Sequence, residues 1–300
     1  MEVLATLCST VSSGDAVDEE LRTWLATHPL MIKTISAAFK SRDAPTRIAA
    51  AECLGNLVFE HEDNATLFTR EQLAITSLLH RLRDSDLAVR GACLIALSAL
   101  VDAGSRETKS LVCHIAGTPT ALLAVVKMDR EDAIRRAAAV VLESLVAEPS
   151  IGAVLVETGG TLEALVSLCR DDDYVIVRRA SAMLRMLTSR EEQCDAVARV
   201  DGALPTLTQQ TRHFDSNVRL ACLSALRNVA KLNHSAAQLV ATTPGISDAV
   251  SSGIKDPDPR VASLAKDLVS FLTPFRRAAA QHRDEEQAGF VNSVKTLVGW

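Results

Sequence analysis

Histidine and cysteine side chains, the usual metal ligands and nucleophiles, are scattered along this 300-residue chain rather than grouped. The sequence has no Walker phosphate loop, dinucleotide glycine fingerprint, Gly-x-Ser-x-Gly elbow or His-Glu-x-x-His run. Cys113-His114 has no Cys-x-x-Cys partner, and a single His61-Glu62 pair cannot assemble a site built from repeated pairs. We therefore predict no catalytic residue, no cofactor-binding residue and no metal ligand, and hence a protein that is not an enzyme.

A helical repeat positions the remaining side chains. The segment 151–187 shows its plan: two short helices (151–157 and 162–169) separated by Gly159-Gly160, then an acidic turn (171–173) and a longer third helix. Counting Ile176 as position 1, apolar residues fall at positions 1, 5, 8, 9 and 12, which is one face of a helix. Units of this kind cannot bury that face alone and must stack on neighbours.

The same pattern of positions occurs six times along the chain. Position 1 falls at Thr46, Val89, Ile134, Ile176, Val218 and Val261, which are 43, 45, 42, 42 and 43 residues apart. Position 9 is Leu54, Leu97, Leu142, Leu184, Leu226 and Val269, and position 12 is Leu57, Leu100, Leu145, Leu187, Val229 and Leu272. Position 5 is always small: Ala50, Cys93, Ala138, Ala180, Cys222 and Ala265. We therefore predict an all-α fold, a right-handed α-solenoid of about six repeats with terminal capping helices.

Charged residues recur in the same register. An acid commonly lies four residues before an arginine at the start of the third helix: Asp43/Arg47, Asp86/Arg90, Glu131/Arg135, Asp215/Arg219 and Asp256/Arg260. The acid suits a helix N-terminus, where free N–H groups and the helix dipole favour negative charge. The arginine can reach an acid in its own or the next repeat. We interpret these pairs as a structural ladder between repeats rather than as a row of ligand-binding sites.

The hinges identify the family that the repeat resembles. The runs 154–160 (Val-Leu-Val-Glu-Thr-Gly-Gly) and 196–205 (Ala-Val-Ala-Arg-Val-Asp-Gly-Ala-Leu-Pro) resemble armadillo hinges, and 256–260 (Asp-Pro-Asp-Pro-Arg) is closer to HEAT repeats. The resemblance covers residues 15–273 and implies a protein–protein interaction scaffold or adaptor that binds a partner segment in the groove lined by the third helices.

A basic set on the third helices is the candidate site that this resemblance implies. Its members lie off the apolar positions and should face solvent in the groove, where guanidinium groups could bind the carboxylates of an acidic, extended segment. We call these residues the basic set: Arg136, Arg178, Arg179, Arg185, Arg227, Asn228 and Lys231. Armadillo import receptors carry Trp at position 7 and Asn at position 11, whereas position 7 here includes Glu52 and Ile95 and never Trp, which disfavours binding of nuclear-import signals.

Two other functions remain as alternatives. Small armadillo proteins also resemble Hsp70 nucleotide-exchange factors, which clasp a chaperone with the whole groove. HEAT-like repeats also build metal-dependent hydroxylases and lyases. Deoxyhypusine hydroxylase, for example, binds its metal through His-Glu pairs on successive repeats. This sequence contains only the pair His61-Glu62, so the metal-dependent enzyme is the weaker alternative.

Composition bounds the partners and the location. The formal charge of −5 disfavours nucleic acid and anionic membranes, both of which need a basic excess. The opening Met1-Glu2 has no basic region before an apolar run, and no apolar run approaches 18 residues, so we expect neither secretion nor a membrane span. Seven scattered cysteines suggest a reducing compartment. We expect a cytoplasmic or nuclear protein.

The ends of the chain depart from the repeat. Residues 1–14 are predicted to form an N-terminal cap, 15–273 the solenoid, and 274–300 a C-terminal capping helix or tail. In the tail, a polar helix at 275–288 precedes an apolar cluster that includes Phe290 and Trp300. This cluster could cover the last repeat or bind a partner.

Overall fold

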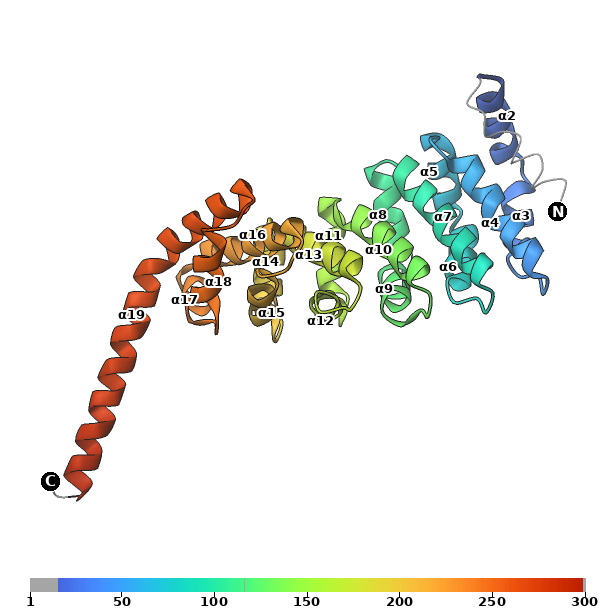
Figure 1. Ribbon diagram of the computed structural model, residues 1–300. Helices are drawn as coiled ribbons and strands as arrows, with labels where there is room; N and C mark the ends of the chain where they lie inside the picture. Colours follow the sequence, from blue (N-terminus) through green and yellow to red (C-terminus); the bar gives the residue numbers. More distant parts are fainter. Residues whose placement is uncertain (1–15, 116, 299–300) are drawn as a thin grey trace. The chain divides into compact units, whose positions relative to one another are not determined.

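The computed structural model describes residues 16–115 and 117–298, without the side chains of 16–18, 279–280 and 282–298. Its helices fall into six groups of three (Figure 1). Their bounds are α2 Ala16–Thr27, α3 Met31–Ala38, α4 Ala44–Val58; α5 Glu62–Arg70, α6 Gln72–Arg81, α7 Leu87–Ala103; α8 Arg106–His114, α9 Thr118–Met128, α10 Asp132–Val146; α11 Pro149–Glu157, α12 Thr161–Leu168, α13 Tyr174–Thr188; α14 Glu191–Arg199, α15 Ala203–Gln210, α16 Ser216–Leu232; and α17 His234–Thr242, α18 Ile246–Gly253, α19 Pro259–Val298. The fold is an all-α solenoid, as predicted.

By its contacts the chain divides into two compact units. Unit one comprises Met1–Ala164 and Asp173–Arg179, and unit two comprises Leu165–Asp172 and Ala180–Trp300. In unit one the third helices α4, α7 and α10 pack in succession. In unit two α16 packs against α17 and α19. Each unit therefore buries its apolar faces by stacking helices of neighbouring repeats.

The predicted apolar face is the core of both units. All six residues at position 5 are fully buried, and the six residues at position 12 are at most 1% exposed. Position 9 is fully buried in the first five repeats, whereas Val269 in the sixth is half-buried and its neighbour Leu268 is buried instead. Small side chains at position 5 let adjacent helices approach closely.

Glycine shapes the predicted hinge between the first and second helices. Four hinge glycines have a positive φ near the left-handed helical region, which costs other residues energy because of their Cβ atom. They are Gly117 (φ 87°), Gly160 (81°), Gly202 (74°) and Gly245 (80°). The third to sixth repeats thus share one turn geometry, and the hinge runs 154–160 and 196–205 that the sequence analysis named contain two of these glycines.

The last helix differs from the sequence expectation. The sequence predicts a boundary between residues 273 and 274 and a separate polar helix at 275–288. Instead, α19 runs without a break from Pro259 to Val298, with Pro274 inside it (Figure 1). The predicted N-terminal cap and the side chains of Phe290 and Trp300 lie outside what the structure describes, so the proposed roles of these segments remain predictions.

The six cysteines that the structure describes are free and buried. Burial raises the pKa of the Cys93 and Cys169 thiols to about 12 and that of Cys113 to about 11. Because the thiolate is the reactive form, we expect the native Cys8→Ala variant to stay unlabelled by a disulfide reagent while the denatured chain takes up six equivalents. Rapid labelling of the native variant would contradict this burial. The substitution removes Cys8, which lies outside the described residues.

No single described helix is long and apolar enough to cross a membrane. Two bent pairs, α8 with α9 and α10 with α11, reach the required length and composition only together, with bends of 76° and 113°.

Candidate functional site

A ladder of ion pairs joins the third helix of one repeat to the turn before the third helix of the next. Arg47 donates to Asp84 at 2.7 Å, Arg90 pairs with Asp129 at 2.7 Å, and Arg219 pairs with Asp256 at 2.6 Å. Arg219 and Asp256 make two parallel bonds, Nε to Oδ2 and Nη2 to Oδ1, the geometry in which guanidinium binds carboxylate most strongly. The predicted inter-repeat role is confirmed for Arg47, Arg90 and Arg219, whereas Arg260 pairs with Asp258 of its own repeat.

Two of the three ladder acceptors, Asp84 and Asp129, are not acids that the spacing singled out, whereas the third, Asp256, is. Asp43, Asp86 and Asp215 cap their own helices by accepting backbone N–H bonds, as predicted. Asp84 and Asp129 lie two residues before the predicted acids Asp86 and Glu131, and each also accepts the backbone N–H of that acid. The pattern Asp-x-acid before the third helix could have identified them.

Arg136, a member of the basic set, belongs to this ladder. Its Nε donates to Asp173 Oδ2 at 2.6 Å, whereas Arg135 donates to the Val126 carbonyl. Arg135 also pairs with Asp132 of its own repeat, with Nη1 and Oδ1 3.4 Å apart. In the fifth repeat His213 stands where other repeats have the ladder acid, and its Nδ1 accepts the Asp215 N–H at 3.1 Å. Burial lowers the pKa of His213, which favours the neutral ring that this bond requires.

The other members of the basic set are distributed over both units. In unit one, Arg179 pairs with Glu143, and Arg178 is half-buried. In unit two, Arg227 lies 3.8 Å from Asp267, Asn228 is half-buried, and Arg185 and Lys231 are exposed. Among the described residues, the Arg178, Arg185 and Lys231 side chains have no hydrogen-bond or ion-pair partner. These three are the cations of the set that a ligand could bind without displacing another group.

A preformed groove lies in unit one between the third helices of the first two repeats. It has a volume of about 390 Å³ and is lined by α4 and α7: Ile48, Ala51, Glu52, Gly55, Asn56, Phe59, Ala88, Gly91, Ala92, Ile95, Ala96 and Ala99. We call it the α4–α7 groove. The floor of the groove is formed by small residues because α4 and α7 lie in close contact there. A Cβ atom added to Gly55 would lie 3.3 Å from the Cα of Ala96.

Large apolar side chains border this floor. Ile95 is 70% exposed and Phe59 is 53% exposed, although both are of the type that usually packs inside. Glu52, exposed at position 7, is the charged residue of the lining. The sequence analysis did not predict this groove, because it chose candidate residues by their charge. The groove instead forms where two helices carry only small side chains between them.

The lone His-Glu pair has a structural role. His61 caps α5, since its Nδ1 accepts the Asn64 N–H, and its Nε2 lies 3.0 Å from the Thr23 hydroxyl oxygen. Within the described residues, no three histidine, cysteine, aspartate or glutamate side chains are grouped so that they could hold a metal ion.

Comparisons with known proteins agree with this architecture. The family model described as sister chromatid cohesion protein PDS5 protein matches residues 31–197. No curated protein sequence matches the chain. Among solved structures, computationally designed armadillo repeat proteins for modular peptide recognition superpose with a TM-score of 0.69 at 18% identity, covering 80% of this chain and 99% of theirs.

Two further designed proteins are similar. The designed armadillo repeat protein YIII(Dq)4CqI has a TM-score of 0.65 at 18% identity, covering 80% of this chain and 99% of its own. The designed armadillo repeat protein YIII(Dq.V1)4CPAF, solved in complex with the peptide (KR)4, has a TM-score of 0.56 at 16% identity and covers 77% and 99%. At these identities the similarity establishes the armadillo-repeat fold.

Proposed function

The chain belongs to the family of sister chromatid cohesion protein PDS5 proteins, and from this premise we propose that it is a non-enzymatic scaffold that binds a segment of a protein partner along its third helices. Helical arrays present extended surfaces of this kind, and the designed armadillo proteins of similar fold include peptide binders.

The α4–α7 groove is the observation that carries the proposal. It offers a floor of alanine and glycine, with the exposed side chains of Ile95 and Phe59 at its borders. Its volume falls within the range of about 300–1,000 Å³ found for binding pockets. Exposed apolar side chains beside a hollow are typical of interaction sites, because covering them with a partner removes apolar area from water.

Replacing Ile95 by aspartate tests this groove. A carboxylate there would have to be desolvated by an apolar partner side chain, so we expect binding to weaken by at least about tenfold. The measurement is quantitative affinity purification from the host, followed by titration of each partner found. Leu73→Asp is the matched control, because Leu73 is 52% exposed in α6 and lies outside the groove. Partners lost equally from both variants, or from neither, would count against the proposal.

The basic set is a separate part of the proposal, with Arg178 in unit one and Arg185 and Lys231 in unit two. Arg178, Arg185 and Lys231 would bind carboxylates of an acidic segment, while Arg136 and Arg179 support the fold through Asp173 and Glu143. The informative variant is therefore Arg178→Glu with Arg185→Glu and Lys231→Glu, which leaves the ladder intact. If this triple variant retains every partner at wild-type affinity, the basic set is not a binding site.

The family match favours one process in which such a scaffold could serve. The description of the family names sister chromatid cohesion, and a role in that process would place the protein in the nucleus. Depletion in the host should then cause premature separation of sister chromatids in chromosome spreads, and unchanged cohesion would exclude the role. Regulation of an Hsp70 chaperone, the alternative, predicts faster nucleotide release from Hsp70 when the protein is added.

A further inference from the structure

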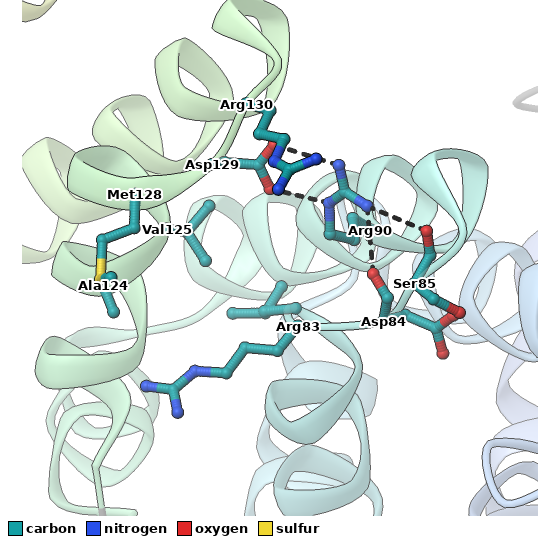
Figure 2. A pocket seen from close by; sticks show the side chains of 10 residues that line it. Arg83, Asp84, Ser85, Arg90, Ala124, Val125, Met128, Asp129 and Arg130 are labelled. Atoms are coloured by element: carbon teal, nitrogen blue, oxygen red, sulfur yellow. Dashed lines mark hydrogen bonds and ion pairs between the residues drawn. The ribbon is translucent and has the colours of Figure 1, made fainter.

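A second hollow in unit one lies at the turns between the second and third helices, away from the α4–α7 groove. It has a volume of about 560 Å³ and lies between the α6–α7 turn and the end of α9 (Figure 2). Its lining is Leu82, Arg83, Asp84, Ser85, Arg90, Ala124, Val125, Met128, Asp129 and Arg130, and it shares no residue with the lining of the α4–α7 groove. We call it the turn pocket.

The acidic side chains of the turn pocket are already neutralised. Asp129 is held by Arg90, through Nε at 2.7 Å and Nη2 at 3.1 Å. Asp84 is held by Arg47 at 2.7 Å and Arg81 at 3.2 Å. Arg90 also donates to the backbone carbonyls of Asp84 and Ser85 (Figure 2).

Two arginines remain without a partner. Among the described residues, the exposed guanidinium groups of Arg83 and Arg130 make no hydrogen bond or ion pair. Figure 2 shows the Arg83 side chain extending from its turn toward α9, where Met128 and Ala124 lie. Because Asp84 and Asp129 are paired, the charge that the turn pocket offers to a ligand is positive.

The apolar part of the turn pocket is also available. Met128 is 76% exposed, and it lies beside Ala124 and Val125 of the same helix. An unbranched thioether side chain adapts its shape to the group that it covers. The turn pocket thus combines an adaptable apolar surface with two free guanidinium groups.

A comparison within the chain separates this pair from ordinary helix-end charges. Every repeat has an exposed lysine or arginine two residues after its second helix: Lys40, Arg83, Arg130, Arg170, Arg212 and Lys255. Cations at that place complement the negative end of the helix dipole, which explains the register in all six repeats. Arg83 and Arg130 differ from a lone helix-end cation because both line the same hollow, together with the exposed Met128.

We infer that the turn pocket is a second binding site, for an acidic peptide segment of a protein partner that places an apolar side chain against Met128 and carboxylates against Arg83 and Arg130. Guanidinium–carboxylate bonds are charge-assisted and directional, and the apolar contact supplies the area that such bonds alone lack. The site is independent of the proposed groove function, since the two hollows have different linings.

Methyl NMR of methionine tests this inference directly. The chain has five methionines, and Met31 and Met183 are buried, so their signals serve as internal references for Met128. The probe is the peptide Glu-Asp-Leu-Glu-Asp, with Lys-Lys-Leu-Lys-Lys and Gln-Asn-Leu-Gln-Asn as controls. We expect the Met128 methyl signal, assigned with Met128→Leu, to shift saturably with the acidic peptide and not with the other two.

The variant Arg83→Gln with Arg130→Gln should bind the acidic peptide at least about tenfold more weakly, because two charge-assisted contacts are lost. Lys40→Gln with Lys255→Gln is the matched control: it removes the same charge from the same register and should bind as wild type. Thermal melting checks that both variants fold.

Three results would overturn the inference: no saturable Met128 shift at millimolar peptide, equal weakening in the control variant, or an equal shift with the basic peptide. An oligothymidine that shifts Met128 as strongly as the acidic peptide would likewise overturn the assignment to a peptide. The variant Ile95→Asp should keep the Met128 response, so failure of the groove proposal and failure of this one can be told apart.

Discussion

Replacing Asp84 by alanine should destabilise unit one by about 3 kcal/mol, because Arg47 would keep a buried guanidinium without its carboxylate. The side chains of Arg47 and Asp84 are 9% and 2% exposed, so water cannot take the place of the lost partner. Arg81 and the Asp86 N–H would lose the same acceptor. The measurement is urea unfolding, with hydrogen exchange to locate the loss of protection in α4 and α7.

Two companion variants test whether the loss in Asp84→Ala comes from the missing charge and from its burial. Asp84→Asn keeps an oxygen that can accept the Asp86 N–H, so we expect it to lie between wild type and Asp84→Ala. Glu107→Gln breaks the Arg70–Glu107 pair, whose side chains are 64% and 69% exposed, and it should change stability by less than about 0.5 kcal/mol. Equal losses for Asp84→Ala and Glu107→Gln would contradict the importance of the ladder.

The same pair predicts a pH dependence. Burial opposes ionisation of Asp84, but hydrogen bonds from Arg47, the Asp86 N–H and Arg81 outweigh it and lower its pKa below 3.8. A carboxylate whose pKa is lowered by folding stabilises the protein above its unfolded pKa, and this contribution is lost as the pH falls through the folded pKa. The stability difference between wild type and Asp84→Asn should therefore be constant at neutral pH and shrink below about pH 4.

Replacing Leu97 by alanine should cost about 2–5 kcal/mol, because a fully buried leucine leaves both lost apolar contact and a cavity. Leu97 is position 9 of α7, and α7 packs between α4 and α10. A cavity there should weaken two repeat interfaces at once, which hydrogen exchange would show as reduced protection in all three helices.

Ile95 provides the matched control for Leu97. It lies two residues away in the same helix, has the same size and is 70% exposed, so Ile95→Ala should change stability by less than about 0.5 kcal/mol. A large loss for Ile95→Ala, or a small one for Leu97→Ala, would mean that the apolar register of the third helix is wrong.

The sequence by itself determined the repeat and its register. Burial of a side chain on a helix depends on its position modulo the helical period, so the recurrence of Leu54, Leu97 and Leu142 at position 9 was sufficient to identify the core. Gly160 and Gly202 marked hinges for a similar local reason, since a positive φ strongly favours glycine. The helix-capping acids Asp43 and Asp86 were likewise predictable from their place before a helix.

Only the tertiary structure decided which charges are free and where the surface is hollow. Arg136 and Arg178 have the same residue type and similar places on the third helix, yet Asp173 pairs with Arg136. That pairing depends on the distance between groups 37 residues apart. The α4–α7 groove and the turn pocket arise in the same way, from how far neighbouring side chains reach across two helices. Periodicity records which face of a helix is buried, whereas free charge and hollow space are properties of pairs of elements and appear only when those elements are packed together.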